Sequence, residues 1–200
     1  MSSSPKEFNG LLITLTGPTA SGKSSIAKRL SDHIDNISLS VSTTTRKPRK
    51  GEVDGREYFY VDEQEFEKRI NEGQFLEHAN YGKNRYGTEL KNISLAEENA
   101  NDLVFDIEVQ GVEQLKALYP RQTRCIFVFP VSFEEIEKRL RRRGSESEEQ
   151  ISRRLEIARK EVEVLESEGF SDYKVINDSL DRAVEEVVQI IKSERGALKD

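Results

Sequence analysis

The chain has 200 residues, and its 31 Lys and Arg residues against 37 Asp and Glu residues give a formal net charge of −6. Hydrophobic residues make up 35% of the chain and charged residues 34%, so we expect one soluble domain with a modest core. The acidic balance argues against a protein that mainly binds nucleic acid or membrane surfaces. The single cysteine excludes an internal disulfide framework and a cysteine-rich zinc site.

Apolar runs alternate with helical patterns along the chain. Four short runs predict buried strands, at residues 11–16, 103–106, 126–129 and 173–177. Apolar residues at helical spacing predict a helix around 26–30 and further helices at 112–118, 133–142, 149–165 and 180–191. Strands that alternate with helices are typical of an α/β fold, with a largely parallel sheet flanked by helices.

We expect this core to comprise residues 10–37, 101–137 and 151–194. Two other segments have a different pattern. Residues of about 38–100 contain turn signals, many tyrosines and short alternating runs, which predict an inserted lobe with strands of its own. Within it, Asp62 followed by Glu65 predicts the start of a helix that runs through Ile70. Residues of about 138–150 are highly charged, contain a glycine and predict a mobile lid.

The first predicted strand leads into a phosphate-binding loop. The sequence GPTASGKS at residues 17–24 matches G-x-x-x-x-G-K-[ST], directly after a strand and at the start of a helix. Glycines let backbone N–H groups surround phosphate oxygens, and the helix N-terminus adds its positive dipole end. We expect ATP to contact the run Gly17, Pro18, Thr19, Ala20, Ser21, Gly22, Lys23, Ser24 and Ser25. Lys23 would supply a charge to the β- and γ-phosphates, and the Ser24 hydroxyl a ligand to Mg²⁺.

Several further motifs carry a resemblance to a known family. They are SVSTTTRKPR at 40–49, GEVDGREY at 51–58, FLEH at 75–78, YGT at 86–88, DIEVQG at 106–111, the lid run from Arg139 to Gly144, and VIND at 175–178. From about residue 10 to 191 the chain resembles guanylate kinases. This resemblance implies a P-loop NTPase core with a GMP-binding lobe and a lid. It also implies ATP-dependent phosphorylation of GMP and dGMP by in-line transfer, with Mg²⁺ carried by ATP, in purine nucleotide metabolism.

The resemblance assigns the acceptor site to the lobe. A nucleotide phosphate dianion calls for permanently charged bidentate donors, and Arg46 and Arg49 stand three apart beside a proline. By resemblance both grip the GMP phosphate, helped by the hydroxyls of Tyr58 and Tyr86. From the residues alone, a solvated basic turn or a small nucleic-acid patch remains an alternative.

Guanine offers two donors, N1–H and N2–H₂, on one edge. A single carboxylate can accept from both, and the resemblance gives this role to Glu77, with Ser42 and Thr88 as neighbouring hydroxyls. Asp106 ends an apolar strand, where a Walker B-like carboxylate would orient Mg²⁺ waters or the acceptor. The resemblance also places Glu108 at the acceptor site, although the commoner residue there is Asp.

The donor side draws on the predicted lid. By resemblance Arg139, Arg143 and Arg154 reach the ATP phosphates and the transferring group, and Asn177 lies near the adenine. Phosphoryl transfer depends on positioning and charge stabilisation rather than on a covalent nucleophile. Together with Lys23, Arg46 and Asp106, these three arginines form the expected catalytic set.

Two other functions remain open at this point. One is a phosphopeptide-binding module of the same fold without catalysis, which the presence of Lys23, Arg139 and Arg143 disfavours. The other is a P-loop kinase of a different nucleoside monophosphate, which Ser42, Glu77 and Thr88 disfavour. The sequence indicates no protein partner, and we expect no nucleic-acid or membrane partner. The absence of an apolar leader at residues 1–9 predicts a cytoplasmic protein.

Overall fold

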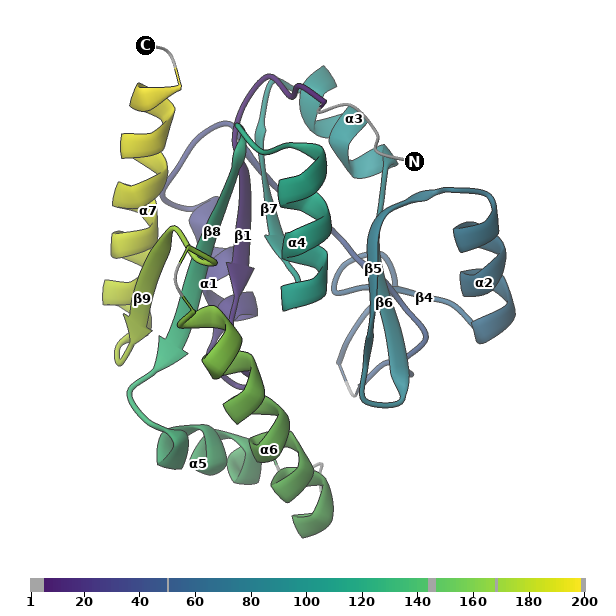
Figure 1. Ribbon diagram of the computed structural model, residues 1–200, viewed down its shortest axis with the longest axis vertical. Helices are drawn as coiled ribbons and strands as arrows, with labels where there is room; N and C mark the ends of the chain where they lie inside the picture. The colour runs from purple at the N-terminus through teal and green to yellow at the C-terminus, as the bar shows by residue number, and fades with distance from the viewer. Residues whose placement is uncertain (1–5, 50, 144–146, 168, 199–200) are drawn as a thin grey trace.

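A five-stranded parallel sheet forms the centre of the molecule. The computed structural model describes residues 6–49, 51–143, 147–167 and 169–198 (Figure 1). The sheet has the order β2-β7-β1-β8-β9, with β2 at Ile37–Leu39, β7 at Asp102–Asp106, β1 at Leu12–Thr16, β8 at Thr123–Pro130 and β9 at Tyr173–Asn177. Each neighbouring pair is parallel. The predicted α/β fold with a parallel sheet is therefore confirmed.

Helices cover both faces of this sheet (Figure 1). On one face, α1 (Lys23–Leu30) and α7 (Leu180–Ala197) pack against β1 residues Ile13 and Leu15. On the other, α3 (Lys91–Glu98) and α4 (Val109–Leu118) pack against Leu12 and Phe105. Burial on both faces explains why the strands read as continuous apolar runs rather than as alternating ones.

The carboxyl ends of β1 and β7 lie side by side. The two strands are in register from Leu12 with Leu103 to Leu15 with Asp106. The connection that follows β1 is the P-loop, and Asp106 is the last residue of β7. In parallel α/β sheets, ligands bind beyond the carboxyl ends of the strands, where neighbouring connections diverge to opposite faces. The topology therefore brings the phosphate loop and Asp106 to one edge.

A second, smaller sheet stands to the side of the core (Figure 1). Its order is β4-β3-β6-β5, with β3 at Thr43–Thr44, β4 at Phe59–Tyr60, β5 at Phe75–Tyr81 and β6 at Asn84–Glu89. The predicted helix is α2 (Glu63–Asn71), and the Asp62 side chain accepts a hydrogen bond from the Glu65 N–H at 2.8 Å. This sheet is the scaffold of the predicted lobe.

The ends of the segment predicted as the lobe belong to the large sheet. Ser38 and Leu39 pair with Leu103 and Val104 of β7, and α3 buries Ile93 and Ala96 in the core. A three-residue strand such as β2 has too short a pattern to be recognised without its partner. The small sheet itself extends only from β3 to β6, whereas the domain boundaries near 38 and 100 remain a prediction.

The predicted lid is largely helical. It includes the end of α5 (Phe133–Arg143) and the start of α6 (Glu148–Leu165), while residues 144–146 lie outside the described residues. Ser147 and Gln150 form a reciprocal capping box at the start of α6. Ile136 and Leu140 pack with Ile151 and with Ala20 of the P-loop, so the two helices contact the phosphate loop directly. Closure of this lid stays a prediction.

Helix α7 continues six residues beyond the predicted end at 191. Near its C-terminus, Arg195 donates to the Asp102 carboxylate at 2.6 Å and to the Asn36 carbonyl at 3.0 Å, which anchors the last turns to β2 and β7. Within the described ranges, no helix is both long and apolar enough to cross a membrane.

Candidate active site

The P-loop joins β1 to α1 and exposes the first turn of that helix. Gly22 precedes the helix with φ of 102°, and a Cβ there would lie 2.1 Å from the Asn177 amide nitrogen, so only glycine fits. Glycine carries no side chain to cap the helix, which leaves its first N–H groups for an anion. The Lys23 side chain is buried and its Nζ donates to the Gly17 carbonyl at 2.7 Å. This arrangement suits a chain of phosphates.

Arg139 and Asn177 hold the loop from behind. The Arg139 guanidinium donates to the carbonyls of Ala20 at 3.2 Å and Ser21 at 3.3 Å, and to the Asn177 carbonyl at 3.1 Å. The Asn177 side chain is only 4% exposed and donates to the Ser21 carbonyl at 2.8 Å. Neither residue lines the cavity that the described residues form beyond the loop. Their direct contact with ATP stays a prediction, and their visible role is to fix the loop.

The other two predicted donor-side arginines differ. Arg154, on α6, donates to the Thr19 hydroxyl at 3.0 Å and lines the cavity. Arg143 is the last residue of α5, and its side chain lies outside the described part of the structure. The lid helix α6 thus reaches the front of the P-loop through Arg154.

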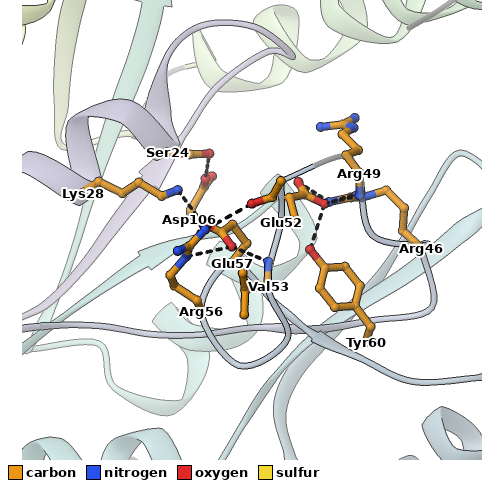
Figure 2. Close-up of polar contacts among 11 residues, drawn as sticks. Ser24, Lys28, Arg46, Arg49, Glu52, Val53, Arg56, Glu57, Tyr60 and Asp106 are labelled. Carbon is orange, nitrogen blue, oxygen red and sulfur yellow. Dashed lines mark hydrogen bonds and ion pairs between the residues drawn. The ribbon is translucent and has the colours of Figure 1, made fainter.

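Ser24 and Asp106 meet where α1 begins and β7 ends. The Ser24 hydroxyl donates to the Asp106 carboxylate (Figure 2). Hydroxyl and carboxylate oxygens are the hard donors that Mg²⁺ prefers, and it usually completes its shell with phosphates and water. The two side chains therefore fit a magnesium ion that is carried on nucleotide phosphates.

The P-loop and the small sheet face one cavity. A cavity of ≈ 180 Å³ is lined by residues 19–25 of the loop, by Arg154, and by Ser42, Arg46, Arg49, Tyr58, Glu77, Tyr86, Asp106 and Glu108. A neighbouring cavity of ≈ 530 Å³ shares Ser24, Ser42, Arg49, Tyr58 and Asp106 with it. Residues more than 80 positions apart in the sequence thus meet across a single cleft between the core and the lobe.

The loop side of the lobe carries aromatic and cationic groups together. The Arg46 guanidinium carbon lies 5.2 Å from the centre of the Tyr58 ring, and the Tyr58 and Tyr86 rings meet edge to face at 5.8 Å. Burial raises the pKa of Tyr58, and the nearby Asp106 carboxylate raises it further. The phenol therefore stays protonated and can donate to an anion.

The other predicted acceptor residues form a buried polar pocket. Glu77 on β5 stands opposite Thr88 on β6, and the Ser42 and Thr88 hydroxyls are 3.4 Å apart. The Glu77 residue is 4% exposed. Burial raises the pKa of this carboxyl to about 7, although hydrogen bonds from the hydroxyl and the N–H of Thr88 act to lower it. A buried carboxylate without a full set of donors is suited to a ligand that brings two N–H groups.

Gly111 on α4 has no side chain, which leaves space for the Glu77 carboxylate. A Cβ at this position would lie 2.6 Å from Oε2 of Glu77 and 3.0 Å from its carboxyl carbon. The site residues predicted from the sequence did not include Gly111, although it is the last residue of the quoted motif DIEVQG. Its helical backbone carries no sign of the contact, which arises only when α4 packs on β5.

Glu108 has an acidic neighbour that the sequence analysis did not single out. Glu108 occupies the N-cap position of α4, and its carboxyl interacts with that of Glu161 on α6. Burial raises the pKa of both carboxyls, and the charge of Lys23 acts to lower it. The Asp106 carboxylate further raises the pKa of Glu108, and Glu108 further raises that of Glu161. Two carboxyls this close favour sharing a proton. The pair therefore joins α6 to a residue that lines the cavity, because Glu108 is part of its lining.

Known proteins share both the sequence and the fold. The chain matches the guanylate kinase family over residues 10–194. It is 43% identical over 185 residues to the guanylate kinase of Oceanobacillus iheyensis, an alignment that covers 92% of this chain and 88% of that protein. It is also 43% identical over 186 residues to the guanylate kinase of Zymomonas mobilis, with 93% and 85% coverage.

Solved structures agree with this similarity. The crystal structure of guanylate kinase from Anaplasma phagocytophilum superposes with a TM-score of 0.75 at 30% identity, over 93% of this chain and 86% of that chain. A gluconokinase from Sinorhizobium meliloti superposes with a TM-score of 0.52 at 15% identity, over 97% and 98% of the two chains. The second likeness concerns the fold alone.

Proposed function

The chain belongs to the guanylate kinase family, and on that premise we propose how its cleft divides the work of phosphorylating GMP. It is a guanylate kinase, because relatives of that name match it at about 40% identity over more than nine tenths of its length. ATP and GMP are the substrates that this membership implies. The observation that carries the assignment to the cleft is that the P-loop and the Glu77 pocket line one cavity.

The lobe binds the acceptor at two points. The Glu77 carboxylate accepts from guanine N1–H and N2–H₂, while Ser42 and Thr88 surround the same edge. Arg46, Arg49, Tyr58 and Tyr86 grip the phosphate, for which guanidinium groups and phenols are matched donors. Adenine offers neither of these donors, because its N1 is an acceptor and its C2 carries no amino group, so a buried carboxylate rejects it strongly, by a factor on the order of 10⁴. We include dGMP among the acceptors, because the proposed contacts involve the base and the phosphate rather than the sugar.

The core binds the donor and stabilises the transferring group. The N–H groups at the start of α1 hold phosphate oxygens, and Lys23 moves its charge from the Gly17 carbonyl to the nucleotide. Arg154 and the predicted lid residues Arg139 and Arg143 add positive charge as the γ-phosphoryl group passes in line to the GMP phosphate. Asn177 holds the loop in place.

Ser24 and Asp106 are the residues that would hold the magnesium of Mg-ATP, which enzymes of this kind typically use. At this site the ion would neutralise charge on the phosphates and help to align them. Glu108, two residues beyond Asp106, lies near the acceptor as a further carboxyl. Closure of residues of about 138–150 would exclude water from the transfer. A cytoplasmic location remains an expectation from the sequence.

The experiment that tests this function is ADP production by the purified chain with Mg-ATP. GMP, dGMP, AMP, UMP and a sample without acceptor are compared at equal concentration. We expect fast turnover with GMP, slower turnover with dGMP and near-background rates with the others. Fast turnover with AMP or UMP would contradict the acceptor assignment, and phosphopeptide binding without any turnover would support the binding-module alternative instead.

A further inference from the structure

The turn that follows Arg49 contains a carboxylate, Glu52, to which the proposed function above assigns no role. Glu52 accepts hydrogen bonds from Nη1 of Arg46 at 2.9 Å and from Nη2 of Arg46 at 3.0 Å. It also accepts from the Arg49 backbone N–H at 2.7 Å and from the Tyr60 hydroxyl at 2.8 Å (Figure 2). One carboxylate thus joins both proposed phosphate-binding arginines to the small sheet.

This contact is more than a loose surface ion pair. The side chains of Arg46 and Glu52 are only 12% and 17% exposed, and the pairing is bidentate. Burial acts to raise the pKa of Glu52, but the donors from Arg46, Arg49 and Tyr60 together lower it to about 2. Glu52 is therefore ionised at every pH at which a kinase works. Fixed geometry and several charge-assisted hydrogen bonds are the conditions under which an ion pair holds a side chain in place.

The contact leaves one edge of the Arg46 guanidinium for a ligand. Within the described part of the chain, the hydrogen bonds of Arg46 to Glu52 and to the Lys47 carbonyl come from Nη1 and Nη2, and none comes from Nε. A guanidinium has two forked edges, and a phosphate can bind the edge formed by Nε and Nη2 while a carboxylate holds the other. Arg46 lines the cavity from this fixed position, beside Tyr58.

A rival interpretation is that Glu52 merely occupies the place of the phosphate and leaves when GMP arrives. Displacement would break the hydrogen bonds to Tyr60 and to the Arg49 backbone as well as those to Arg46. The Arg49 N–H belongs to the backbone of the turn and Tyr60 lies on β4, so an incoming phosphate does not replace what Glu52 loses. Figure 2 also shows the Arg49 side chain directed away from Glu52, which holds only its backbone.

We propose that Glu52 is a positioning residue for the acceptor phosphate, which orients the Arg46 guanidinium and the backbone of Arg49 and remains in place when GMP binds. This inference rests on the proposed function, because it assumes that Arg46 and Arg49 receive the GMP phosphate. Tyr60 completes the arrangement, because its hydroxyl donates to Oε2 of Glu52, the same oxygen that accepts from Nη1 of Arg46 and from the Arg49 N–H.

The first test is Glu52→Gln, which keeps the shape but removes the charge. We expect the KM for GMP to rise by about tenfold or more, while the KM for ATP changes by less than about twofold, because only acceptor binding is affected. The affinity for GMP measured by calorimetry should fall, whereas the affinity for guanosine, which lacks the phosphate, should not. A lower KM for GMP in Glu52→Gln would show that Glu52 competes with the phosphate and would overturn the proposal.

The matched control is Glu89→Gln. Glu89 is a buried carboxylate of the same small sheet, it accepts from the Thr43 hydroxyl and from Nη1 of Arg69, each at 2.7 Å, and it does not line either cleft cavity described above. If loss of a lobe ion pair acted only through stability, both variants would raise the KM for GMP alike, and the proposal would fail. We expect the change only in Glu52→Gln.

A double-mutant cycle with Arg46→Ala shows whether Glu52 acts through Arg46. In the Arg46→Ala background, Glu52→Gln should weaken GMP binding by less than about threefold further, the remainder reflecting the Arg49 backbone. A full tenfold loss in that background would contradict the proposal.

A second variant, Tyr60→Phe, replaces Glu52→Gln if the latter does not fold. We expect it to raise the KM for GMP by about two- to threefold, because Glu52 loses one donor. An unchanged KM in Tyr60→Phe would contradict the proposal. An inactive wild-type chain would instead overturn the proposed function.

Discussion

The two walls of the cleft are built in different ways. On the core side, the groups that we propose to bind the nucleotide are largely backbone N–H groups of the P-loop, with Lys23 as the main charge. On the lobe side they are side chains, and the buried residues include Ser42, Glu77 and Thr88. A backbone site binds phosphate chains of any nucleotide, whereas a side-chain site can distinguish one base from another.

The two walls are also held in place differently. Arg139 and Asn177 fix the P-loop from behind through its carbonyl groups. In the lobe, carboxylates fix other side chains, as Glu52 does with Arg46 and Glu89 with Arg69. Variants in the core should therefore alter the use of ATP, while variants in the lobe should alter the recognition of GMP. The following predictions test this separation, beginning with the largest effect.

Lys23→Ala should reduce kcat by at least about 10³-fold, because a buried charge aimed at the transferring phosphoryl group acts mainly in the transition state. GMP affinity, measured by calorimetry, should stay within about twofold of the wild type, since the lobe is unchanged. A variant with near-normal turnover would show that the P-loop is misassigned, and one that loses GMP binding would show that the two walls are not independent.

Glu77→Gln should change stability with pH. The folded pKa of Glu77 is about 7, above the ordinary value of 4.5 for the unfolded chain, so the protonated carboxyl stabilises the fold at low pH. That stability is lost as the pH rises from about 4.5 through 7, by at most about 3 kcal/mol. The neutral Gln avoids this loss. In thermal unfolding without nucleotide, the stability of the variant relative to the wild type should increase from pH 5 to pH 8. If this relative stability were equal at both pH values, the burial of an ionising Glu77 would be contradicted.

Gly111→Ala should raise the KM for GMP by about tenfold, because the added methyl group displaces the Glu77 carboxylate from its position. The KM for ATP should remain within about twofold. Ala is otherwise favoured in a helix, so Gly196→Ala, on α7 with open space around it, is a control for the gain in helix propensity. Unchanged acceptor kinetics in Gly111→Ala would mean that Glu77 can move aside without loss.

Asn177→Ala should raise the KM for ATP by about threefold and lower thermal stability slightly, because the Ser21 carbonyl loses a buried donor. The KM for GMP should not change. The kinetic constants for both substrates, measured at saturating co-substrate, check this. An equal rise in both constants would show that the brace behind the loop also supports the lobe.

Much of the core could be predicted from the sequence because its signals are local. The strand Tyr173–Asn177 has the predicted bounds, and α5 and α6 differ from their predicted bounds by a single residue each at one end. Strand β2 was not predicted, because its three residues form a strand only through their pairing with β7. The end of α7 was also predicted too early, because the helix continues beyond its apolar pattern to the contact of Arg195 with Asp102.

The sequence by itself predicted the chemistry that we propose for both walls. The P-loop motif dictates its own backbone through glycine spacing, and the resemblance of the lobe motifs to guanylate kinases assigns a carboxylate, hydroxyls and arginines to guanine and phosphate. Only the tertiary structure decided which groups support them. Asn177 lies behind the loop, Gly111 lies against Glu77, and Glu52 holds Arg46. The Asn177 and Gly111 contacts join residues far apart in the chain. The contact of Glu52 with Arg46 spans six positions but depends on how the turn folds against Tyr60, and none of the three leaves a local pattern to read.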